Sequence, residues 1–361
     1  MKSLKLIAFY LPQYHPIPEN DAWWGAGFTE WRNVVKARSL FPGHRQPRLP
    51  GELGFYDLRL SETREHQAEL ARLAGISGFC YYHYWFGGRL LLEKPLELVA
   101  STNSPDFPFC VCWANHHWTN HWAGHSDDIL VEQVYPGAED DWQHYSYLRR
   151  FFTDPRYLTR NGRPVFVVFH PCDIPDVSAF VDRFKAWAIR DGLGELWMIG
   201  LDHRRELLDQ GFDSLAPHTL NLTLSKYLTG WRRAVQVFKH RVLRYPRWVI
   251  NYSSLDGYFD HDGYDGITLC PTLIPNWDNT PRIGRRGLVL TNTSPSQFAS
   301  HLQRGIAGLR RVTSTEERFV FIKSWNEWAE GNYLEPDLEW GRGWLRAVRD
   351  TIQDTVTSQY T

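Results

Sequence analysis

Eight short apolar runs recur along the chain of 361 residues, and segments with helical hydrophobic spacing lie between most of them. The runs cover residues 4–10, 76–85, 109–113, 165–170, 196–201, 214–217, 268–274 and 319–325. Continuous apolar strands that alternate with helices are typical of a parallel sheet covered on both faces. Eight such units predict an α/β fold of the (β/α)8, or TIM-barrel, type.

The arrangement predicts one (β/α)8 catalytic domain over residues 1–361, because barrels of this length are common as single domains. The sixth and seventh units are the least regular. Residues 220–265 form a long, aromatic and basic stretch, which we interpret as an insertion among long βα loops. A flavodoxin-like or Rossmann sheet is the alternative, but no G-x-G-x-x-G motif follows the first apolar run.

Aromatic residues are unusually frequent, with 17 Trp, 17 Tyr and 20 Phe. Such rings can build a core, or they can provide flat platforms for ligands with apolar faces, such as sugars. The net charge of −1 gives no reason to expect nucleic acid or an anionic membrane as a partner. No stretch approaches the roughly 18 apolar residues of a membrane span.

The first apolar run is short and is followed at once by Pro12, so it favours a first strand over a secretory signal. We therefore expect a cytoplasmic location. The number of cysteines is odd, and most of them lie in or beside apolar runs. We expect them to be reduced and mostly buried: Cys80, Cys110, Cys112, Cys172 and Cys270.

Polar and aromatic side chains follow the end of nearly every predicted strand. In a (β/α)8 barrel the carboxyl ends of all strands open onto one face, where active sites lie. We therefore expect one sugar-binding pocket formed by Tyr10, His15, Tyr82, His83, Trp85, Trp113, Asn115, His116, Trp118, Trp277, Asp278, Trp325 and Asn326. Its aromatic lining should include Tyr10, Tyr82, Trp85, Trp113 and Trp277.

The eighth run leads into the stretch FVFIKSWNEWAEGNYLEP, which contains Glu327 and Glu330. If the chain leaves the strand near Asn326, helped by Gly331, this pair can lie on one side of a turn, with Cβ atoms about 5–6 Å apart. Two carboxylates at that distance suit glycoside chemistry, in which one holds a proton and the other acts as a charged group. A solvated loop is the alternative, but the flanking aromatic residues disfavour it.

Metal chemistry has weaker support. His117, His121 and His125 are spaced four residues apart, but no H-E-x-x-H motif occurs, and hydrogen-bonding histidines are the preferred interpretation. Asp260 and Asp262 form a D-x-D pair, the arrangement with which some sugar-nucleotide transferases hold a divalent ion. This pair lies in a glycine-rich stretch typical of a solvated turn. We expect no metal and no cofactor.

Longer motifs carry a resemblance to a known family: AFYLPQYHPIPENDAWWGAGFTEW, GHRQPRLPGELGFYDLR, GFCYYHYWFGGRLLLEKPLE, DPRY, NGRPVF, WDNTPR and SWNEWAEGNYLEPD. Over residues 6–347 the chain resembles the WbsX-type polysaccharide-biosynthesis proteins, a group similar to glycoside hydrolase family 99. The resemblance implies a (β/α)8 fold and endo-acting, retaining cleavage of α-mannoside-like bonds in an oligosaccharide or polysaccharide, without a metal.

The resemblance also implies roles for individual residues. Glu327 looks like the base that takes the proton of the sugar 2-hydroxyl, which then attacks C1 to form a 1,2-anhydro sugar. Glu330 looks like the general acid for the leaving oxygen and later the base for water. Trp24 lies in the first matching motif, and we expect it to contact sugar. Glu335 is assigned to structure or to sugar contact, since Pro336 fixes the chain beside it, and we expect it to be dispensable for the chemistry.

One position departs from the pattern of the family. WbsX-type sequences usually read Trp-Ala-Asn-Glu-Asn-Trp after the third strand, and here His116 replaces the glutamate between Asn115 and His117. If that glutamate orients sugar hydroxyls, substrate preference differs here. If it is needed for the chemistry, activity is lost.

Three functions follow as hypotheses. The first is a retaining glycosidase acting on a bacterial surface or capsular polysaccharide. The second is a glycosyltransferase of O-antigen or capsule biosynthesis, although no phosphate-binding turn is evident in the sequence. The third is a carbohydrate-binding protein with an altered catalytic site.

Overall fold

The computed structural model describes residues 3–120, 128–217, 220, 224, 227–259, 266–312 and 317–357. Four residues considered in the sequence analysis lie outside these ranges: His121, His125, Asp260 and Asp262.

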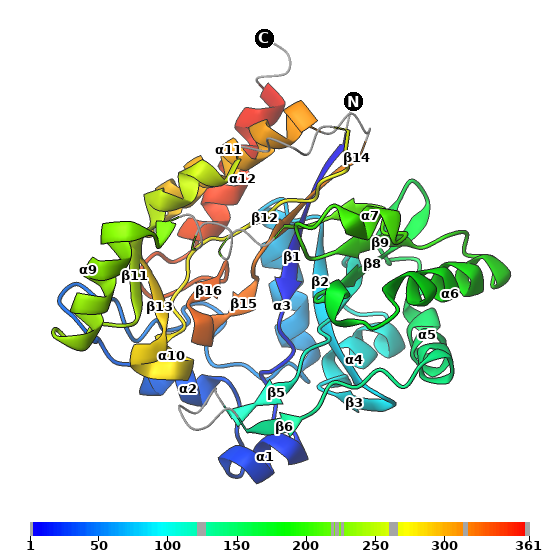
Figure 1. Cartoon of the computed structure of the whole chain (residues 1–361), viewed down its shortest axis with the longest axis horizontal. Coiled ribbons are helices and arrows are strands. Elements are labelled where there is room, and N and C mark those ends of the chain that lie inside the picture. The colour runs from blue at the N-terminus through cyan, green and yellow to red at the C-terminus, as the bar shows by residue number, and fades with distance from the viewer. Residues whose placement is uncertain are drawn as a thin grey trace.

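Eight parallel strands form the centre of the molecule (Figure 1). They are β1 (Ser3–Tyr10), β2 (Gly78–Phe86), β4 (Phe109–Trp113), β8 (Arg163–Val168), β9 (Trp197–Gly200), β10 (Ser214–Leu215), β12 (Thr272–Leu273) and β14 (Glu317–Ile322). The sheet order is β10-β9-β8-β4-β2-β1-β14-β12, so neighbours follow chain order and β14 returns to β1. A parallel bridge between Leu215 and Leu269 joins β10 to the chain just before β12. The predicted TIM-barrel-like fold is confirmed.

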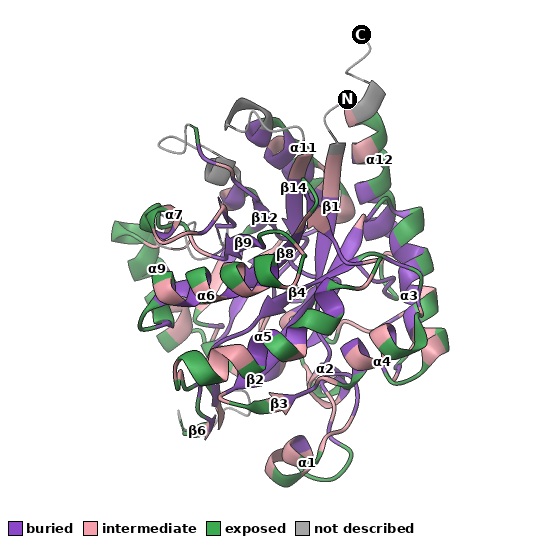
Figure 2. Ribbon diagram, turned by 90° about the vertical axis from the view of Figure 1, so that its right-hand side faces the viewer, coloured by how far each residue is buried: buried purple, intermediate pink, exposed green. Residues whose placement is uncertain are grey.

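Helices cover the outside of these strands. They are α3 (Ser61–Leu73), α4 (Lys94–Thr102), α5 (Ala138–Phe152), α6 (Val177–Arg190), α7 (Glu206–Asp209), α11 (Pro295–Val312) and α12 (Gly343–Thr357). In Figure 2 the strands are buried along most of their length, and several covering helices are buried on one side and exposed on the other.

Helix α6 shows how the sequence produces this arrangement. It begins after Asp176, whose Oδ1 accepts a hydrogen bond from the Ala179 amide at 3.2 Å, as in a typical N-cap. Phe180, Val181 and Phe184 have helical spacing and are buried. Burying each of these side chains contributes about 1.5–3 kcal/mol, so this face holds the helix to the sheet.

Short elements extend the loops around the barrel. They are α1 (Pro18–Trp24), α2 (Trp31–Lys36), β3 (Arg89–Leu91), β5 (Trp118–Thr119), β6 (Ile129–Val131), β7 (Thr159–Arg160), η2 (Pro171–Asp173), β15 (Asn326–Glu327), η5 (Trp328–Glu330) and β16 (Asn332–Tyr333). Most of them follow the carboxyl end of a barrel strand, and β15 and η5 contribute residues to the site described below.

The predicted insertion forms a substructure that extends beyond residue 265. It contains α9 (Gly230–Arg241), β11 (Trp248–Asn251) and η3 (Tyr252–Phe259), and β11 pairs in parallel with β13 (Leu288–Thr291). The elements α10 (Thr280–Ile283) and η4 (Gly284–Arg286) precede β13. A second apolar cluster holds this unit together: Leu220, Ile250, Tyr252, Leu255, Ile274, Trp277, Leu288 and Leu290.

All five cysteines are free, and only Cys172 among them is exposed. The expectation of burial therefore holds for four of the five. Among the described residues, no helix is both long enough and apolar enough to cross a membrane.

Candidate active site

A pocket of about 720 Å³ lies at the carboxyl ends of the barrel strands. This volume is in the range typical of small-molecule sites. The lining comes from at least seven of the eight strand ends and from the insertion: Leu11, Tyr82, Tyr84, Ala114, His116, Phe169, His170, Leu201, Asp202, His203, Leu220, Trp277, Arg282, Lys323, Glu327 and Glu330.

Glu327 and Glu330 both line this pocket, as the sequence predicts. The chain leaves β14 at Ile322 and forms a two-residue strand, β15, which pairs antiparallel with β16 so that Glu327 lies opposite Asn332. The single turn η5 then carries Glu330. This change from strand to turn brings two side chains three positions apart to the same cavity.

Glu327 is almost fully buried, with 5% of its surface exposed. Its Oε2 atom accepts a hydrogen bond from Asn332 Nδ2 at 3.2 Å. Burial, together with the charge of Glu330, raises the pKa of Glu327 to about 7, and the cations Lys323 and Arg282 oppose this rise. Glu327 therefore exchanges its proton near neutral pH, where a general acid or base is most effective.

Glu330 is held by an ion pair with a buried arginine. Arg282 Nη1 donates to Glu330 Oε1 at 2.6 Å, and its Nε donates to Glu30 Oε2 at 3.0 Å. Burial opposes the charge on Arg282, but Glu30 and Glu330 outweigh it and raise the pKa of the guanidinium. This short contact with Arg282 holds the Glu330 carboxyl group in a fixed position at the pocket.

Lys323 is a second cation at the site, and the sequence analysis did not identify it. Its Nζ lies 5.1 Å from the ring centroid of Phe169 and 5.8 Å from that of Trp277. Lys323, Phe169 and Trp277 all line the pocket. Arg282 was also missed, because its partners Glu30 and Glu330 lie 252 and 48 residues away in sequence.

Tyr82 and Trp277 line the pocket as expected, but Trp85 and Trp113 do not. Trp85 Nε1 donates to Asp140 Oδ2 of α5 at 3.1 Å, and the Trp113 indole donates to the Trp85 carbonyl at 3.1 Å. The expectation was wrong because successive side chains of a strand point to opposite faces.

His83 follows the same rule as Trp85. Its Nε2 lies 2.9 Å from His144 Nε2 on α5, on the outer face of β2. Tyr82 and Tyr84 alternate with it and face the pocket. His83 therefore packs between sheet and helix and does not line the cavity.

Tyr10 and Glu335 belong to a buried network outside the pocket. The Tyr10 hydroxyl donates to Gln67 Oε1 at 2.6 Å, and Gln67 Nε2 donates to Glu335 Oε1 at 2.6 Å. Tyr56 and Trp328 donate to Glu335 Oε2 at 2.8 and 2.6 Å. Neither Tyr10 nor Glu335 lines the cavity. The expectation that Tyr10 does so was wrong, and the contacts of Glu335 are structural.

Asn115 and Asn326 hold the strand ends that do line the pocket. Asn326 Oδ1 accepts from the Leu11 amide at 2.7 Å, and its Nδ2 donates to the Leu11 carbonyl at 3.0 Å. Asn115 makes the same paired contact with His170, at 2.8 Å in each direction. Both amides therefore fix the shape of the pocket without lining it.

The remaining predicted aromatic residues and His15 pack around the site without lining it. Trp325 is fully buried, and its ring centroid lies 5.1 Å from that of Phe79. The Trp118 ring packs 5.0 Å from the ring of Tyr84, which does line the pocket. His15 is buried, and Trp24 is half-buried.

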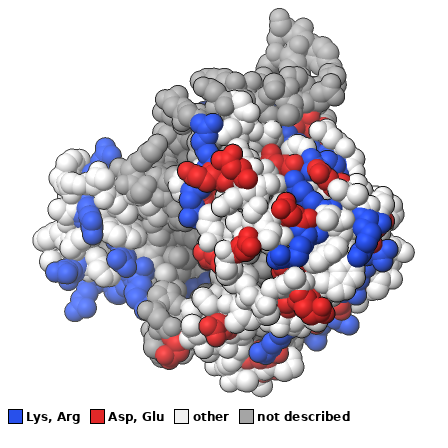
Figure 3. Space-filling view, turned by 45° about the vertical axis from the view of Figure 1, so that its right-hand side comes forward, with Lys and Arg blue, Asp and Glu red and all other residues white. Residues whose placement is uncertain are grey.

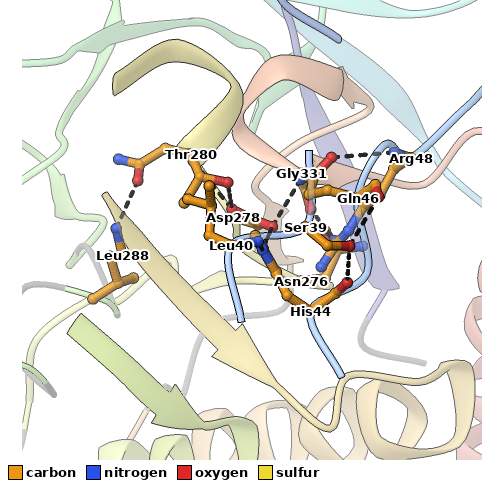
Figure 4. Close-up of polar contacts among 11 residues, drawn as sticks. Ser39, Leu40, His44, Gln46, Arg48, Asn276, Asp278, Thr280, Leu288 and Gly331 are labelled. Atoms are coloured by element: carbon orange, nitrogen blue, oxygen red, sulfur yellow. Dashed lines mark hydrogen bonds and ion pairs between the residues drawn. The ribbon is translucent and has the colours of Figure 1, made fainter. Parts of the chain in front are cut away.

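Asp278 lies beside Gly331, which follows the turn that carries Glu330 (Figure 4). Its Oδ2 accepts from His44 Nε2 and from Gln46 Nε2, each at 2.7 Å. Its backbone amide donates to the Glu330 carbonyl at 2.6 Å, and Arg48 Nη1 donates to the neighbouring Gly331 carbonyl at 2.9 Å. Asp278 therefore positions the turn that carries Glu330 and does not line the cavity.

His116, the residue that departs from the family pattern, does line the pocket. Burial lowers its pKa to about 3, with His170 and Lys323 acting in the same direction, so the ring is neutral at pH 7. A glutamate at this position would be attracted to the charges of Lys323 and Arg282. A neutral imidazole instead offers one hydrogen-bond donor and one acceptor. Among the described residues, no group of three His, Cys, Asp or Glu side chains is arranged to hold a metal.

Solved structures share this fold. The family 99 endo-α-mannosidase from Bacteroides thetaiotaomicron superposes with a TM-score of 0.57 at 13% identity, over 99% of this chain and 98% of that one. A glycoside hydrolase-like protein gives 0.59 at 15% identity, over 96% and 93% of the two chains. Similarity at these identities establishes the (β/α)8 architecture.

Sequence relatives are closer. Two strains of Xanthomonas campestris pv. campestris have an uncharacterized protein, WxcX, that is 38% identical over 349 residues. The match covers 96% of this chain but 49% of WxcX, so the chain spans about half the length of these curated relatives. The family model described as glycosyltransferase WbsX matches residues 6–348, which is nearly the whole chain, and the protein therefore belongs to the WbsX family.

Proposed function

We propose that this protein is a retaining glycosidase that cleaves an α-linked, mannoside-like bond in a bacterial surface polysaccharide. The observation that carries the proposal is the placement of Glu327 and Glu330 in one pocket at the carboxyl end of a (β/α)8 barrel. Their different surroundings support different roles. Trp277 and Tyr82 provide apolar surface for a sugar ring in the same cavity.

In the proposed first step, the carboxylate of Glu327 takes the proton of the sugar 2-hydroxyl. The freed oxygen attacks C1, and the bond from C1 to the leaving oxygen breaks as that oxygen takes a proton from Glu330. The product is a 1,2-anhydro sugar. Because the substrate supplies its own nucleophile, no protein carboxylate needs to reach C1.

In the second step, water attacks C1 of the anhydro sugar and gives its proton to Glu330. The 2-oxygen takes its proton back from Glu327, which returns both glutamates to their starting states. Two inversions at C1 give net retention. In the structure Glu330 is paired with Arg282, so we expect substrate entry to weaken that pair, and Glu330 to take up a proton from solvent before the first step.

A glycosyltransferase is the second candidate, and the description of the family model favours it. In a transferase that used this pocket, a nucleotide would leave from C1 of a nucleotide sugar, and a sugar acceptor would take the place of water in the second step. A carbohydrate-binding protein without catalysis is the third, and the neutral His116 in place of the family's usual glutamate keeps it in consideration.

Thermal-shift and turnover measurements on two ligand panels distinguish these functions. One panel contains α-linked oligosaccharides, and the other contains nucleotide sugars. We expect stabilisation and cleavage with the first panel. Glu327→Gln and Glu330→Gln should each lose at least about 10²-fold in rate and retain binding. Glu339→Gln, at an exposed glutamate paired with Arg45, is the matched control and should keep full activity.

Stabilisation by nucleotide sugars alone would contradict the glycosidase proposal and support a glycosyltransferase. If the wild type and both glutamine variants bind oligosaccharides but show no turnover, the result would support a carbohydrate-binding protein without catalytic activity.

A further inference from the structure

The surface helix α9 carries apolar residues on the side that faces solvent. Trp231, Val235, Phe238 and Val242 are 73%, 39%, 57% and 60% exposed. They are spaced three and four positions apart, and residues at this spacing lie on one face of a helix. Together they form a continuous apolar ridge along α9 and its C-cap residue, Val242.

The same helix turns a polar side chain toward the protein. Gln236 is the buried residue of α9. Its Nε2 donates to the Val249 carbonyl at 2.8 Å, and its Oε1 accepts from the Val249 amide at 3.1 Å. A surface helix ordinarily buries its apolar stripe and exposes its polar face. In α9 this orientation is reversed, so the fold of the described chain does not account for the apolar ridge.

Basic side chains accompany the ridge. The segment from Gly230 to Arg247 contains six of them and no acidic residue: Arg232, Arg233, Lys239, Arg241, Arg244 and Arg247. No Asp or Glu occurs anywhere between Asp213 and Asp256. Figure 3 shows Lys and Arg on the left-hand lobe, where α9 lies in Figure 1, without Asp or Glu on that face. The net charge of −1 is a sum over the whole chain, so it does not reveal this local excess of positive charge.

We propose that α9 and the segment up to Arg247 bind the surface of a membrane that contains anionic phospholipids. A helix with Trp and Phe on one face and Lys and Arg beside it is typical of helices that lie in the membrane interface. The ridge would enter the boundary between headgroups and acyl chains, while the long basic side chains reach the phosphates. Six cations without an anion match anionic headgroups better than an apolar protein surface.

The proposed membrane surface is structurally connected to the pocket. Gln236 attaches α9 to β11, and β11 pairs with β13. Residues of both strands belong to the second apolar cluster together with Trp277, which lines the pocket. Docking through α9 would hold this wall of the pocket close to the lipid surface. The proposal rests on α9 and the segment up to Arg247, and it does not require the proposed glycosidase activity.

Vesicle flotation tests the proposal with the whole chain. One set of vesicles contains phosphatidylcholine, and the other contains phosphatidylcholine and phosphatidylglycerol in equal amounts. We expect binding to the anionic vesicles, weakened by added salt, and little binding to the neutral ones. The double variant Arg232→Gln/Arg233→Gln should reduce partitioning about 30-fold, and Trp231→Ser/Phe238→Ser should reduce it at least about 10-fold.

Matched controls lie on other exposed surfaces. Leu338→Ser and Ile189→Ser remove apolar side chains that are 71% and 55% exposed, and Arg349→Gln removes an exposed cation. These variants should bind vesicles like the wild type. The proposal is overturned if the chain ignores anionic vesicles, or if the α9 variants bind them as well as the controls do. Self-association that Trp231→Ser/Phe238→Ser abolishes, without vesicle binding, would instead make the ridge a contact between copies.

Discussion

The two glutamates of the site are three positions apart, yet their surroundings differ. Glu327 is buried beside Asn332, and Glu330 is partly exposed beside Arg282. The sequence predicts the pair and its unequal environments, because the flanking tryptophans and the short spacing are local features. It does not reveal Arg282 or Lys323, because the contacts that define them join distant parts of the chain.

The first prediction concerns the pH dependence of turnover. Burial raises the pKa of Glu327 to about 7. If Glu327 is the base, only its ionised form is active, so the rate should rise as pH increases through about 7. In Glu327→Gln the residual rate should lack this limb. A wild-type rate that falls as pH rises through 7, while Glu327→Gln stays flat, would make Glu327 the acid instead.

The second prediction concerns the Arg282 ion pairs. Arg282→Met should destabilise the fold by about 3–5 kcal/mol, because it leaves the buried carboxylate of Glu30 without its partner. Adding Glu30→Gln removes that charge and should restore much of the stability, measured by chemical denaturation. Activity should stay low in the double variant, because Glu330 still lacks the arginine. Recovery of full activity would show that Arg282 serves the fold alone.

At the scale of elements, the barrel follows from the sequence in its entirety. All eight apolar runs become parallel strands in chain order, because a strand buried on both faces must be continuously apolar. The sixth and seventh predicted units, which are the least regular in sequence, form the shortest of the eight barrel strands, β10 and β12, with two residues each. Side-chain direction at the strand ends was the main error, and it is visible in β2, where His83 and Trp85 point away from the pocket.

The third prediction concerns the turn η5. Gly331 has a φ of +56°, and a Cβ at this position would lie 2.9 Å from Asp278 Cβ and 3.0 Å from the Asp278 amide nitrogen. Gly331→Ala should therefore displace the turn that carries Glu330 and lower the rate at least about 10-fold, since small misplacements of catalytic groups are costly.

Gly341→Ala is the control for this change. Gly341 has a φ of +53°, and no atom lies within 4 Å of the point that a Cβ would occupy there, so it tests backbone strain without the collision. Both variants should lose about 1 kcal/mol of stability from the left-handed backbone. Equal activity in the two variants would show that the position of η5 does not limit catalysis.

At the scale of the whole molecule, buried acids link stability to pH. Burial raises the pKa of Glu327 and of Glu335 from 4.5 to about 7. Between these values the folded protein holds protons that the unfolded chain releases, so stability is greatest at the acidic end and falls as pH rises through about 7. This direction is opposite to that of a carboxylate stabilised by an ion pair.

The fourth prediction follows from that sign. Glu327→Gln cannot ionise, so it should be more stable than the wild type above pH 7, by on the order of 3 kcal/mol. The two proteins should unfold at nearly the same temperature at about pH 3.5, well below the ordinary pKa of 4.5, because Glu327 is then mostly protonated in both the folded and the unfolded state. Thermal unfolding across this pH range measures the difference. A difference that does not change with pH would show that folding does not shift the pKa of Glu327.

The substructure that follows β10 marks the limit of prediction at this scale. The sequence indicates an insertion from its aromatic and basic composition, but the pairing of β11 with β13 depends on contacts between segments about 40 residues apart. The exposure of the apolar ridge on α9 could not be predicted from the sequence either, because an amphipathic pattern does not say which face of the helix packs against the protein.

The most direct test of the central claim compares leaving groups. Wild type, Glu327→Gln and Glu330→Gln are assayed on α-glycosides of the sugar that the oligosaccharide panel identifies, with one leaving group that needs a proton and one that does not. The account predicts that Glu330→Gln loses at least about 10²-fold on the first and recovers in part on the second, while Glu327→Gln stays inactive on both. An unchanged rate for Glu330→Gln on the leaving group that needs a proton would contradict the account.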